Sequence, residues 1–196
     1  MGRPLAEAAI FDRFSRIYDL TMPAADASVI EPALDRAERD VDHLLDLGGG
    51  TGRGARALSI PRRTVLDASV GMLEKAHGHG LDAVQGDAAT IPLADESVDG
   101  ILVVDALHHF ADVDGTIEEA ARVLRPGGVL VIREFDAGTL RGKLLSFFER
   151  LVGFDSEFFT PTELAARAEA AGLDAALSDT AFNFTLAAVK PTDPNL

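Results

Sequence analysis

The segment that decides the fold spans residues 43–52 and reads HLLDLGGGTG. A short apolar run, His43–Leu47, leads into five residues of which four are glycines, and a helical pattern follows over Arg53–Ser59. Glycines at a strand-to-helix turn let the backbone approach a ligand closely and adopt positive φ. The start of the next helix offers N–H groups to that ligand. The segment therefore predicts a strand, a ligand-binding turn and a helix.

Apolar runs alternate with helical patterns on both sides of this segment. Amphipathic helical spacing precedes it over Leu5–Leu20 and Ala24–Arg39. Further runs read as strands, and the later ones are β-branched and nearly continuous, as in sheets buried on both faces. These runs are Thr64–Leu66, Ala83–Val84, Val98–Val104 and Val129–Ile132. A Pro-Gly-Gly turn at 126–128 is predicted to end one helix and to start the last of these strands.

The pattern changes after Phe135. Residues 136–159 read as helical and rich in Phe, and Thr160–Ala171 reads as a further helix. Two strands, Leu173–Asp179 and Phe182–Val189, follow with a tight turn between them. The series predicts a doubly wound, Rossmann-like α/β fold with a seven-stranded sheet, an antiparallel terminal β-hairpin and helices on both faces.

The length of 196 residues suits one domain with a substantial core. Within it we expect four parts. They are N-terminal helices (1–40), a cofactor-binding core (41–135), a lid or cap segment (136–172) and the terminal hairpin (173–190).

Composition narrows the classes of function. The formal net charge is −14, with 32 acidic residues against 18 Lys and Arg. This charge argues against a nucleic-acid partner, because phosphate binding needs a basic face. The acidic surface reads either as a solvated surface that favours solubility or as an adaptation to high salt, where self-repulsion is screened within about 3 Å.

Cysteine and membrane signals are missing from the sequence. The chain has no cysteine, which excludes disulfides, thiolate metal sites and cysteine nucleophiles. No apolar run approaches the roughly 20 residues of a membrane span, and the first residues do not read as a signal peptide. We expect a cytoplasmic protein without an integral membrane segment. We also expect no metal, because the adjacent His108 and His109 would not share a helix face.

The Gly-rich turn by itself does not choose between two nucleotide-like cofactors. Gly50-x-Gly52-x-x-Ala55 satisfies the dinucleotide fingerprint in its Gly/Ala form. Asp67 follows about 20 residues on, where a ribose of either a dinucleotide or a nucleoside needs an acid. An unpaired carboxylate at a strand end needs a partner, and ribose hydroxyls supply two.

Several further motifs resemble one family when they are taken together and in order. They are VLDASVGML (65–73), QGDAATIPLADESVD (85–99), VVDALHHF (103–110), VLRPGG (123–128) and the opening FDRFSRIYD (11–19). The chain resembles the small-molecule class I S-adenosylmethionine-dependent methyltransferases, nearest to the quinone-biosynthesis C-methyltransferases. This resemblance runs from about Phe11 to Phe135 and implies a methyl transfer from S-adenosylmethionine, with S-adenosylhomocysteine as product, to a small hydrophobic acceptor.

The resemblance also implies roles for individual residues. Asp67 chelates the ribose hydroxyls, Asp87 and the Ala88 N–H face adenine, and Asp46 organises the turn and helps to hold the cofactor's ammonium group. Tyr18 approaches the methionine end of the cofactor. Taken together, the expected cofactor-binding residues are Tyr18, Asp46, Gly48, Gly50, Gly52, Asp67, Ala68, Met72, Asp87, Ala88 and Asp105.

Two residues are the candidates for catalysis. Glu134 is expected at the carboxyl end of the fifth strand, where substrate-facing residues belong, and it would orient the acceptor or take its proton. It would equally pair with Arg133 or with solvent. His108 is the other candidate base, and its competing interpretation is packing that shapes the methionine pocket.

Two other functions stay open at this point. A nicotinamide-dependent oxidoreductase would use the same Gly-rich turn, although a second domain and a Tyr-x-x-x-Lys pair are both missing. A non-catalytic S-adenosylmethionine-binding partner subunit would use the Phe-rich segment 136–160 as an interface. The identity of the acceptor and the oligomeric state, including a homodimer, are not determined by these patterns.

Overall fold

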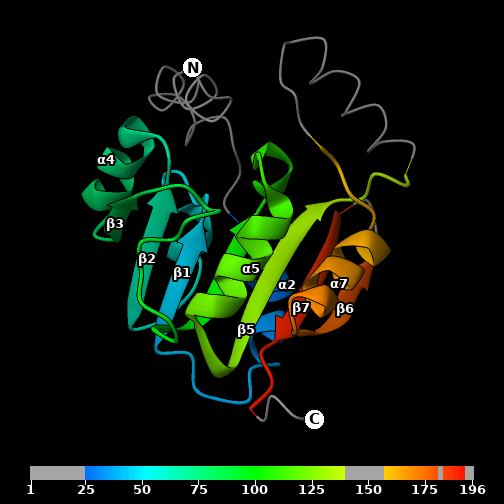
Figure 1. Cartoon of the computed structure of the whole chain (residues 1–196). Helices are drawn as coiled ribbons and strands as arrows, with labels where there is room; N and C mark the ends of the chain where they lie inside the picture. Colours follow the sequence, from blue (N-terminus) through cyan, green and yellow to red (C-terminus); the bar gives the residue numbers. More distant parts are fainter. Residues whose placement is uncertain (1–24, 140–156, 181–182, 193–196) are drawn as a thin grey trace.

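A computed structural model describes residues 25–139, 157–180 and 183–192 of the chain. Its centre is one seven-stranded sheet with the order β3-β2-β1-β4-β5-β7-β6 (Figure 1). The strands are β1 (His43–Leu47), β2 (Arg62–Asp67), β3 (Asp82–Gln85), β4 (Val98–Val104), β5 (Leu124–Phe135), β6 (Asp174–Thr180) and β7 (Asn183–Val189). The first five are parallel, whereas β7 is antiparallel to both β5 and β6.

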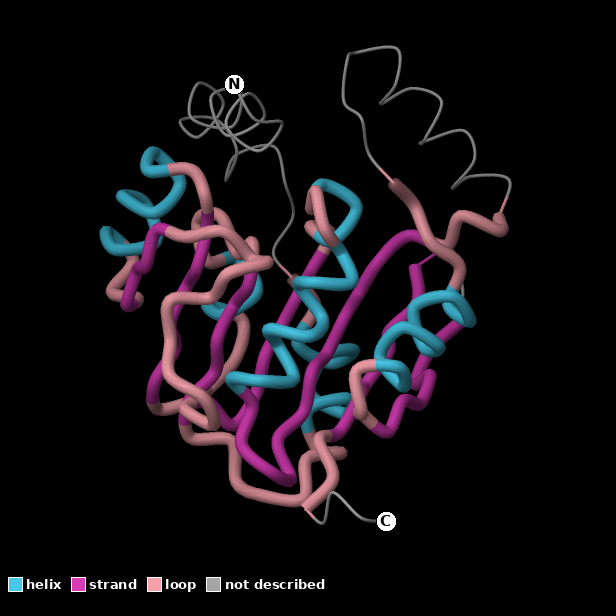
Figure 2. Tube along the Cα trace, in the orientation of Figure 1, coloured by secondary structure: helices cyan, strands magenta, loops and turns pink. Residues whose placement is uncertain are grey.

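Helices cover both faces of this sheet. They are α2 (Ala27–Leu34), α3 (Arg53–Arg56), α4 (Val70–Gly78), the 3₁₀ turn η1 (Leu107–His109), α5 (Val113–Val123) and α7 (Pro161–Ala170). Figure 1 shows α5 and α7 on one side and α2 on the other, and the tube view in Figure 2 shows how the strands lie side by side between them. Several helices begin at polar residues whose side chains accept a backbone N–H, as capping predicts. These caps are Asp26, Ser69, Asp112 and Thr160.

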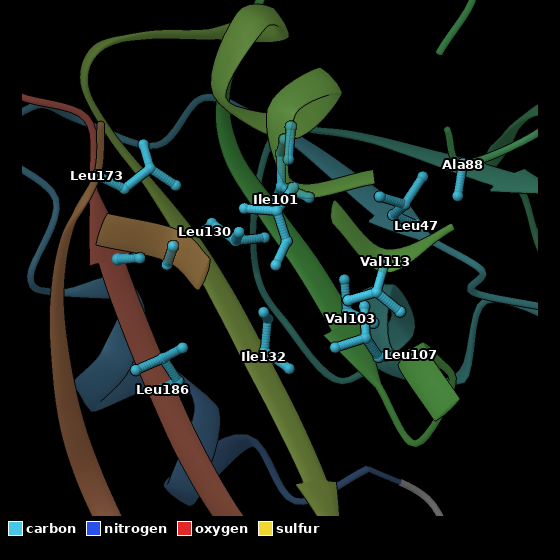
Figure 3. Packing of buried hydrophobic residues seen from close by; sticks show 14 of the residues in the cluster. Leu47, Ala88, Ile101, Val103, Leu107, Val113, Leu130, Ile132, Leu173 and Leu186 are labelled. Atoms are coloured by element: carbon cyan, nitrogen blue, oxygen red, sulfur yellow. The ribbon is translucent and has the colours of Figure 1, made fainter. Parts of the chain in front are cut away.

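The alternation of side chains along the strands builds two separate cores. Leu130 and Ile132 of β5 join the cluster under α5 and α7, whereas Val129 and Val131 join the cluster under α2. Figure 3 shows the first cluster, with labelled residues from neighbouring strands meeting Leu107 and Val113. Because both faces of the central strands are buried, their sequences are nearly continuous in apolar residues.

The predicted fold is confirmed, and the differences are local. The Pro-Gly-Gly stretch lies inside β5 instead of before it, in the irregularity between the pairs Val98–Leu124 and Gly100–Val129. Helices α2 and α3 are shorter than Ala24–Arg39 and Arg53–Ser59. The described ends of the predicted helix 136–159 are also not helical. Asp136 instead accepts the Gly138 N–H in a tight turn, and the Ala137 N–H donates to the Phe159 carbonyl.

The remaining N-terminal and cap predictions fall largely on residues outside the description. These are the helix Leu5–Leu20 and residues 140–156, which include most of the Phe-rich segment. None of the helices within the described ranges combines the length and the apolar character that crossing a bilayer requires.

Candidate functional site

The carboxyl ends of the parallel strands meet at one edge of the sheet. The Gly-rich turn follows β1, Asp67 ends β2, Asp105 follows β4, and Glu134 lies at the end of β5. In a doubly wound sheet this edge is where ligands bind. Residues that are far apart in the sequence are therefore brought to one place, as the strand pattern predicted.

The turn after β1 is built on glycine and on a buried acid. Gly48, Gly50 and Gly52 all have positive φ, and a Cβ on Gly52 would lie 2.1 Å from Leu81 Cδ1. The Asp46 side chain is buried beneath the turn and accepts the Ala55 N–H at 2.8 Å. Burial raises the pKa of Asp46 to about 6, against the lowering effects of this hydrogen bond and of a nearby arginine.

Gly50 lies between two of the residues predicted to contact the cofactor. A Cβ built on Gly50 would be 3.8 Å from Met72 Sδ and 4.0 Å from Asp67 Oδ2. Asp67 is not an unpaired carboxylate, which corrects the expectation from the sequence, because its oxygens accept the N–H groups of Gly50 (2.9 Å) and Ser69 (2.8 Å). These two bonds fix the orientation of the Asp67 carboxylate beside the Gly-rich turn.

The turn after β3 carries Asp87 and Ala88. Asp87 is exposed, and its side chain accepts the Ala89 N–H at 3.0 Å, so it caps its own turn. Ala88 is 8% exposed and belongs to the main core cluster. Ala68 is exposed at the end of β2, and its carbonyl accepts the side-chain amide of Gln85. The structure thus places Asp87 and Ala88 one strand away from Asp67, as adenine beside its ribose would need.

Asp105 has the most unusual environment at this edge. It is a non-glycine residue with φ 51°, and its Oδ2 accepts from Arg53 Nη2 at 2.9 Å. Its Oδ1 is buried and has no hydrogen-bond partner within the described part of the chain. Burial raises the pKa of Asp105, with the Arg53 hydrogen bond acting in the opposite direction. A strained backbone and an unsatisfied buried oxygen together indicate a ligand site.

Glu134 and His108 form a buried pair. His108 Nδ1 lies 2.9 Å from Glu134 Oε2, and each side chain is 4% exposed. Glu134 also accepts the Leu107 N–H at 2.7 Å, and the His108 ring stacks on Phe158 with centroids 4.8 Å apart. In the tautomer whose Nδ1–H donates to Glu134, Nε2 carries the lone pair of the ring. Glu134 pairs with His108 and not with Arg133, whose guanidinium donates to Thr185 Oγ1.

The described site lacks one residue that the sequence predicted and contains one contact that the sequence did not predict. Tyr18 lies outside the described residues. Burial holds the pKa of His109 at about 3, and no group of three His, Asp or Glu in the described ranges is arranged to hold a metal. The Arg53 contact with Asp105 was missed because 52 residues separate the partners, and only the position of Arg53 at the helix start hinted at it.

The residues present fit S-adenosylmethionine. A Cβ at Gly50 would meet Met72 and Asp67 only at van der Waals distance, and the absence of that Cβ lets a ligand such as a ribose approach the backbone closely. The buried Asp105 Oδ1 lacks a hydrogen-bond donor within the described residues, and an ammonium group supplies three.

Comparisons with known proteins agree with this geometry. The family described as methyltransferase domain matches residues 45–132. Demethylmenaquinone methyltransferase from Mycobacterium sp. (strain KMS) is 34% identical over 161 residues, which cover 76% of this chain and 68% of that enzyme. Malonyl-[acyl-carrier protein] O-methyltransferase from Methylococcus capsulatus is 42% identical over 106 residues, or 50% of this chain and 38% of that enzyme.

A solved structure shows the same fold. It is a SAM-dependent methyltransferase from Thermotoga maritima, described as a possible histamine N-methyltransferase, with a TM-score of 0.76, 23% identity, and coverage of 93% of this chain and 99% of that one. These matches decide against the nicotinamide-dependent and the non-catalytic alternatives. The chain belongs to the class I S-adenosylmethionine-dependent methyltransferases, near the quinone C-methyltransferase group, and transfers a methyl group from S-adenosylmethionine to a small-molecule acceptor.

Proposed function

We propose that the acceptor is a hydrophobic, quinol-like molecule whose proton is taken by His108, with Glu134 holding the His108 ring. The observation that carries this proposal is the buried His108–Glu134 pair, stacked against Phe158 at the carboxyl edge of the sheet. Phe135 adds a second ring, with its centroid 6.1 Å from that of His108. Aromatic rings around the His108 imidazole suit a flat apolar ring that carries an ionisable hydroxyl. The similarity to demethylmenaquinone methyltransferases points in the same direction.

The proposed chemistry needs little from the protein beyond alignment and one proton transfer. When bound, S-adenosylmethionine supplies an electrophilic methyl group on a sulfonium. His108 Nε2 accepts the hydroxyl proton of the acceptor, and a ring carbon of the resulting anion then forms a bond to the methyl carbon as the methyl–sulfur bond breaks and S-adenosylhomocysteine leaves. The same ring carbon loses its hydrogen as a proton to solvent, which restores the aromatic ring. Glu134, which accepts from Nδ1, stabilises the imidazolium that results and holds the ring in one tautomer.

The cofactor contacts are also a proposal. Asp67 binds the ribose hydroxyls, Asp87 and the Ala88 N–H bind adenine, and Asp105 Oδ1 accepts from the ammonium group. Their support is position: each lies on the carboxyl edge, on or next to the end of a different parallel strand.

Calorimetry with S-adenosylmethionine, S-adenosylhomocysteine and NAD, in high salt, tests these contacts. We expect micromolar binding of both adenosyl ligands, no binding of NAD, and an affinity loss of about 100-fold in Asp67→Ala, since hydrogen bonds to a charged group are removed. Asp82→Ala is the matched control, because Asp82 is an exposed acid that contacts Arg62 on the surface. Equal affinity in Asp67→Ala would refute the ribose assignment.

Methyl transfer to quinol precursors tests the base. His108→Asn is expected to lower kcat by about 10³-fold with the affinity for S-adenosylmethionine retained, because only the proton transfer is lost. His77→Asn, an exposed histidine on α4, serves as control. Full activity in His108→Asn would remove His108 from the mechanism, and turnover of amines but not of quinols would remove the proposed acceptor.

Further expectations from the sequence are kept as proposals. We infer one methyltransferase domain in which residues 41–135 bind the cofactor and 173–190 complete the sheet. We also infer a cytoplasmic location and an adaptation to high salt, which the net charge of −14 supports. Loss of structure during dialysis into low salt is expected. Sedimentation of the purified protein decides between a monomer and a homodimer, which the sequence patterns leave open.

A further inference from the structure

Arg122, near the end of α5, makes an unusually complete set of contacts with a loop far from it in sequence. Its side chain donates five hydrogen bonds, the number of N–H donors that a guanidinium has. Two go to the carbonyls of Ile91 (2.9 Å) and Leu93 (3.0 Å), and one to Asp95 Oδ1 (2.6 Å). The other two go to the carboxylate oxygens of Glu119 at 2.6 and 2.8 Å.

Glu119 completes the attachment from the same helix. Its Oε2 accepts the Ile91 N–H at 2.8 Å, so both the N–H and the carbonyl of Ile91 are held by α5 side chains. The paired charges also lower the pKa of Glu119, with the Arg122 hydrogen bond as the first cause. A bidentate, partly buried Arg–carboxylate pair has a fixed geometry. Its hydrogen bonds to the loop backbone therefore hold the loop in one conformation.

The start of the loop is fixed as well. The Gly86 N–H donates to the Asp67 carbonyl at 3.1 Å, and a Cβ on Gly86 would lie 3.1 Å from Pro92 Cδ. Asp87 and Ala88 therefore lie in a short turn whose two ends are both anchored. The far anchor is Ile91, which is 3% exposed and held by α5.

We propose that Arg122 and Glu119 are positioning residues for adenine recognition, because they fix the turn that presents the Asp87 carboxylate and the Ala88 N–H to the base. This inference rests on the adenine contacts proposed above. Hydrogen bonds weaken steeply with distance and angle, and a site that is 1 Å too loose loses discrimination before it loses all binding. Neither residue touches the cofactor in this proposal.

The test uses a ratio that general destabilisation does not change. S-adenosylhomocysteine is compared by calorimetry with its inosine counterpart, in which a carbonyl replaces the 6-amino group and N1 carries a proton. That change reverses the hydrogen-bonding pattern that Asp87 and Ala88 offer. We expect the wild-type chain to prefer the adenosine ligand by at least about 100-fold.

Arg122→Met is expected to reduce this preference to below about 10-fold and to weaken S-adenosylhomocysteine binding about 10-fold. Arg122→Lys should restore little of the preference, because an ammonium group cannot donate to both Glu119 oxygens and the loop carbonyls as the planar guanidinium does. Glu119→Gln is the milder variant if Arg122→Met does not fold, and it should give an intermediate preference. The control is Arg39→Met, which removes an arginine that contacts Asp99 and the Pro126 carbonyl instead of the loop.

The outcomes separate this inference from the adenine assignment. A wild-type preference that survives unchanged in folded Arg122→Met and Glu119→Gln overturns the positioning role alone. No preference in the wild-type chain overturns the adenine assignment and the positioning role together. A loss of preference in Arg39→Met equal to that in Arg122→Met would show that the preference does not depend on the contacts with the loop, and it would also overturn the inference.

Discussion

The two ends of β4 carry aspartates in opposite environments. Asp99, near the start of the strand, is 2% exposed and has partners on both oxygens. Its Oδ1 accepts from Arg125 at 2.8 Å and from Arg39 at 3.0 Å, and its Oδ2 accepts the His43 N–H at 2.9 Å. Asp105, just after the end of the strand, has Arg53 on one oxygen and no partner on the other within the described residues.

This difference teaches which end of the sheet serves stability and which serves binding. A buried acid such as Asp99, with hydrogen-bond donors on both oxygens, holds parts of the fold together and is not accessible to a ligand. An acid with one buried oxygen unsatisfied, on a backbone at φ 51°, costs folding free energy that a ligand can offset. The same strand thus has its structural acid at the amino end and its candidate ligand-binding acid at the carboxyl end.

The largest expected effect comes from removing the satisfied acid. Asp99→Ala should lower the free energy of unfolding by roughly 4 kcal/mol, because it leaves two arginines and the buried His43 N–H without their acceptor. The affinity for S-adenosylmethionine of the folded fraction should stay within about twofold of wild type. Urea unfolding and calorimetry check the two parts, and a loss of less than about 1 kcal/mol would contradict the first.

A pH titration of stability examines Asp46, the buried acid under the Gly-rich turn. Its pKa is raised to about 6 in the folded protein, so the native state binds more protons than the unfolded state between about pH 4 and pH 6. Stability from this group is therefore present below about pH 4 and lost as pH rises through 6, by roughly 3 kcal/mol.

Asp46→Asn isolates that contribution. An Asn oxygen still accepts the Ala55 N–H, but the side chain does not titrate. Urea unfolding from pH 4 to pH 7 should show a smaller fall in stability for the variant than for the wild-type chain. Parallel curves for the two proteins would mean that Asp46 titrates with an ordinary pKa.

The unsatisfied acid should give the reverse of the Asp99 result. Asp105→Asn is expected to weaken S-adenosylmethionine binding about 30-fold, or about 2 kcal/mol, since the charged acceptor for the ammonium group is lost. Stability at pH 8 should be unchanged or higher, because the burial of a charge is relieved. Thermal unfolding and calorimetry measure both, with Asp82→Asn as the exposed control. A stable variant with wild-type affinity would show that Asp105 does not face the cofactor.

Most of the sheet could be predicted from the sequence because local patterns of residues indicate where its strands and turns lie. Apolar runs ending in Leu47 and Val104, and glycines that must adopt positive φ, are visible without any knowledge of contacts. The ends of the strands then place Asp67 and Glu134 at one edge, because parallel strands share their direction. The sequence was less informative about 136–139 and 157–159, which read as helical but instead make backbone hydrogen bonds to other segments.

Contacts between distant polar groups were beyond the sequence. No local sequence pattern predicts that Arg53 contacts Asp105, or that Arg122 donates to the carbonyls of Ile91 and Leu93. Asp67 was expected to be unpaired. The N–H groups of Gly50 and Ser69 that donate to it could not be foreseen, because their positions depend on how the Gly-rich turn folds back on β2. These contacts depend on tertiary structure, which fixes side-chain partners only after the strands are ordered.

The smallest expected effect uses a second residue with positive φ. Glu96, just before β4, has φ 51°, the same value as Asp105 after the strand. It is exposed, and its contact with Lys190 at 3.6 Å lies on the surface, where such a pair adds little. Glu96→Gly should therefore raise the free energy of unfolding by about 0.5–1 kcal/mol through relief of the left-handed conformation.

The matched change at the other end of the strand makes this result informative. Asp105→Gly relieves the same backbone conformation, but it removes the Arg53 partner and the proposed ammonium acceptor, so it should lose cofactor affinity and gain no stability. Thermal unfolding should place Glu96→Gly a few degrees above wild type, with unchanged S-adenosylmethionine binding. If both glycine variants gain stability and both keep their affinity, the strain at Asp105 has no connection with the ligand, because the two ends of β4 would then differ only in burial.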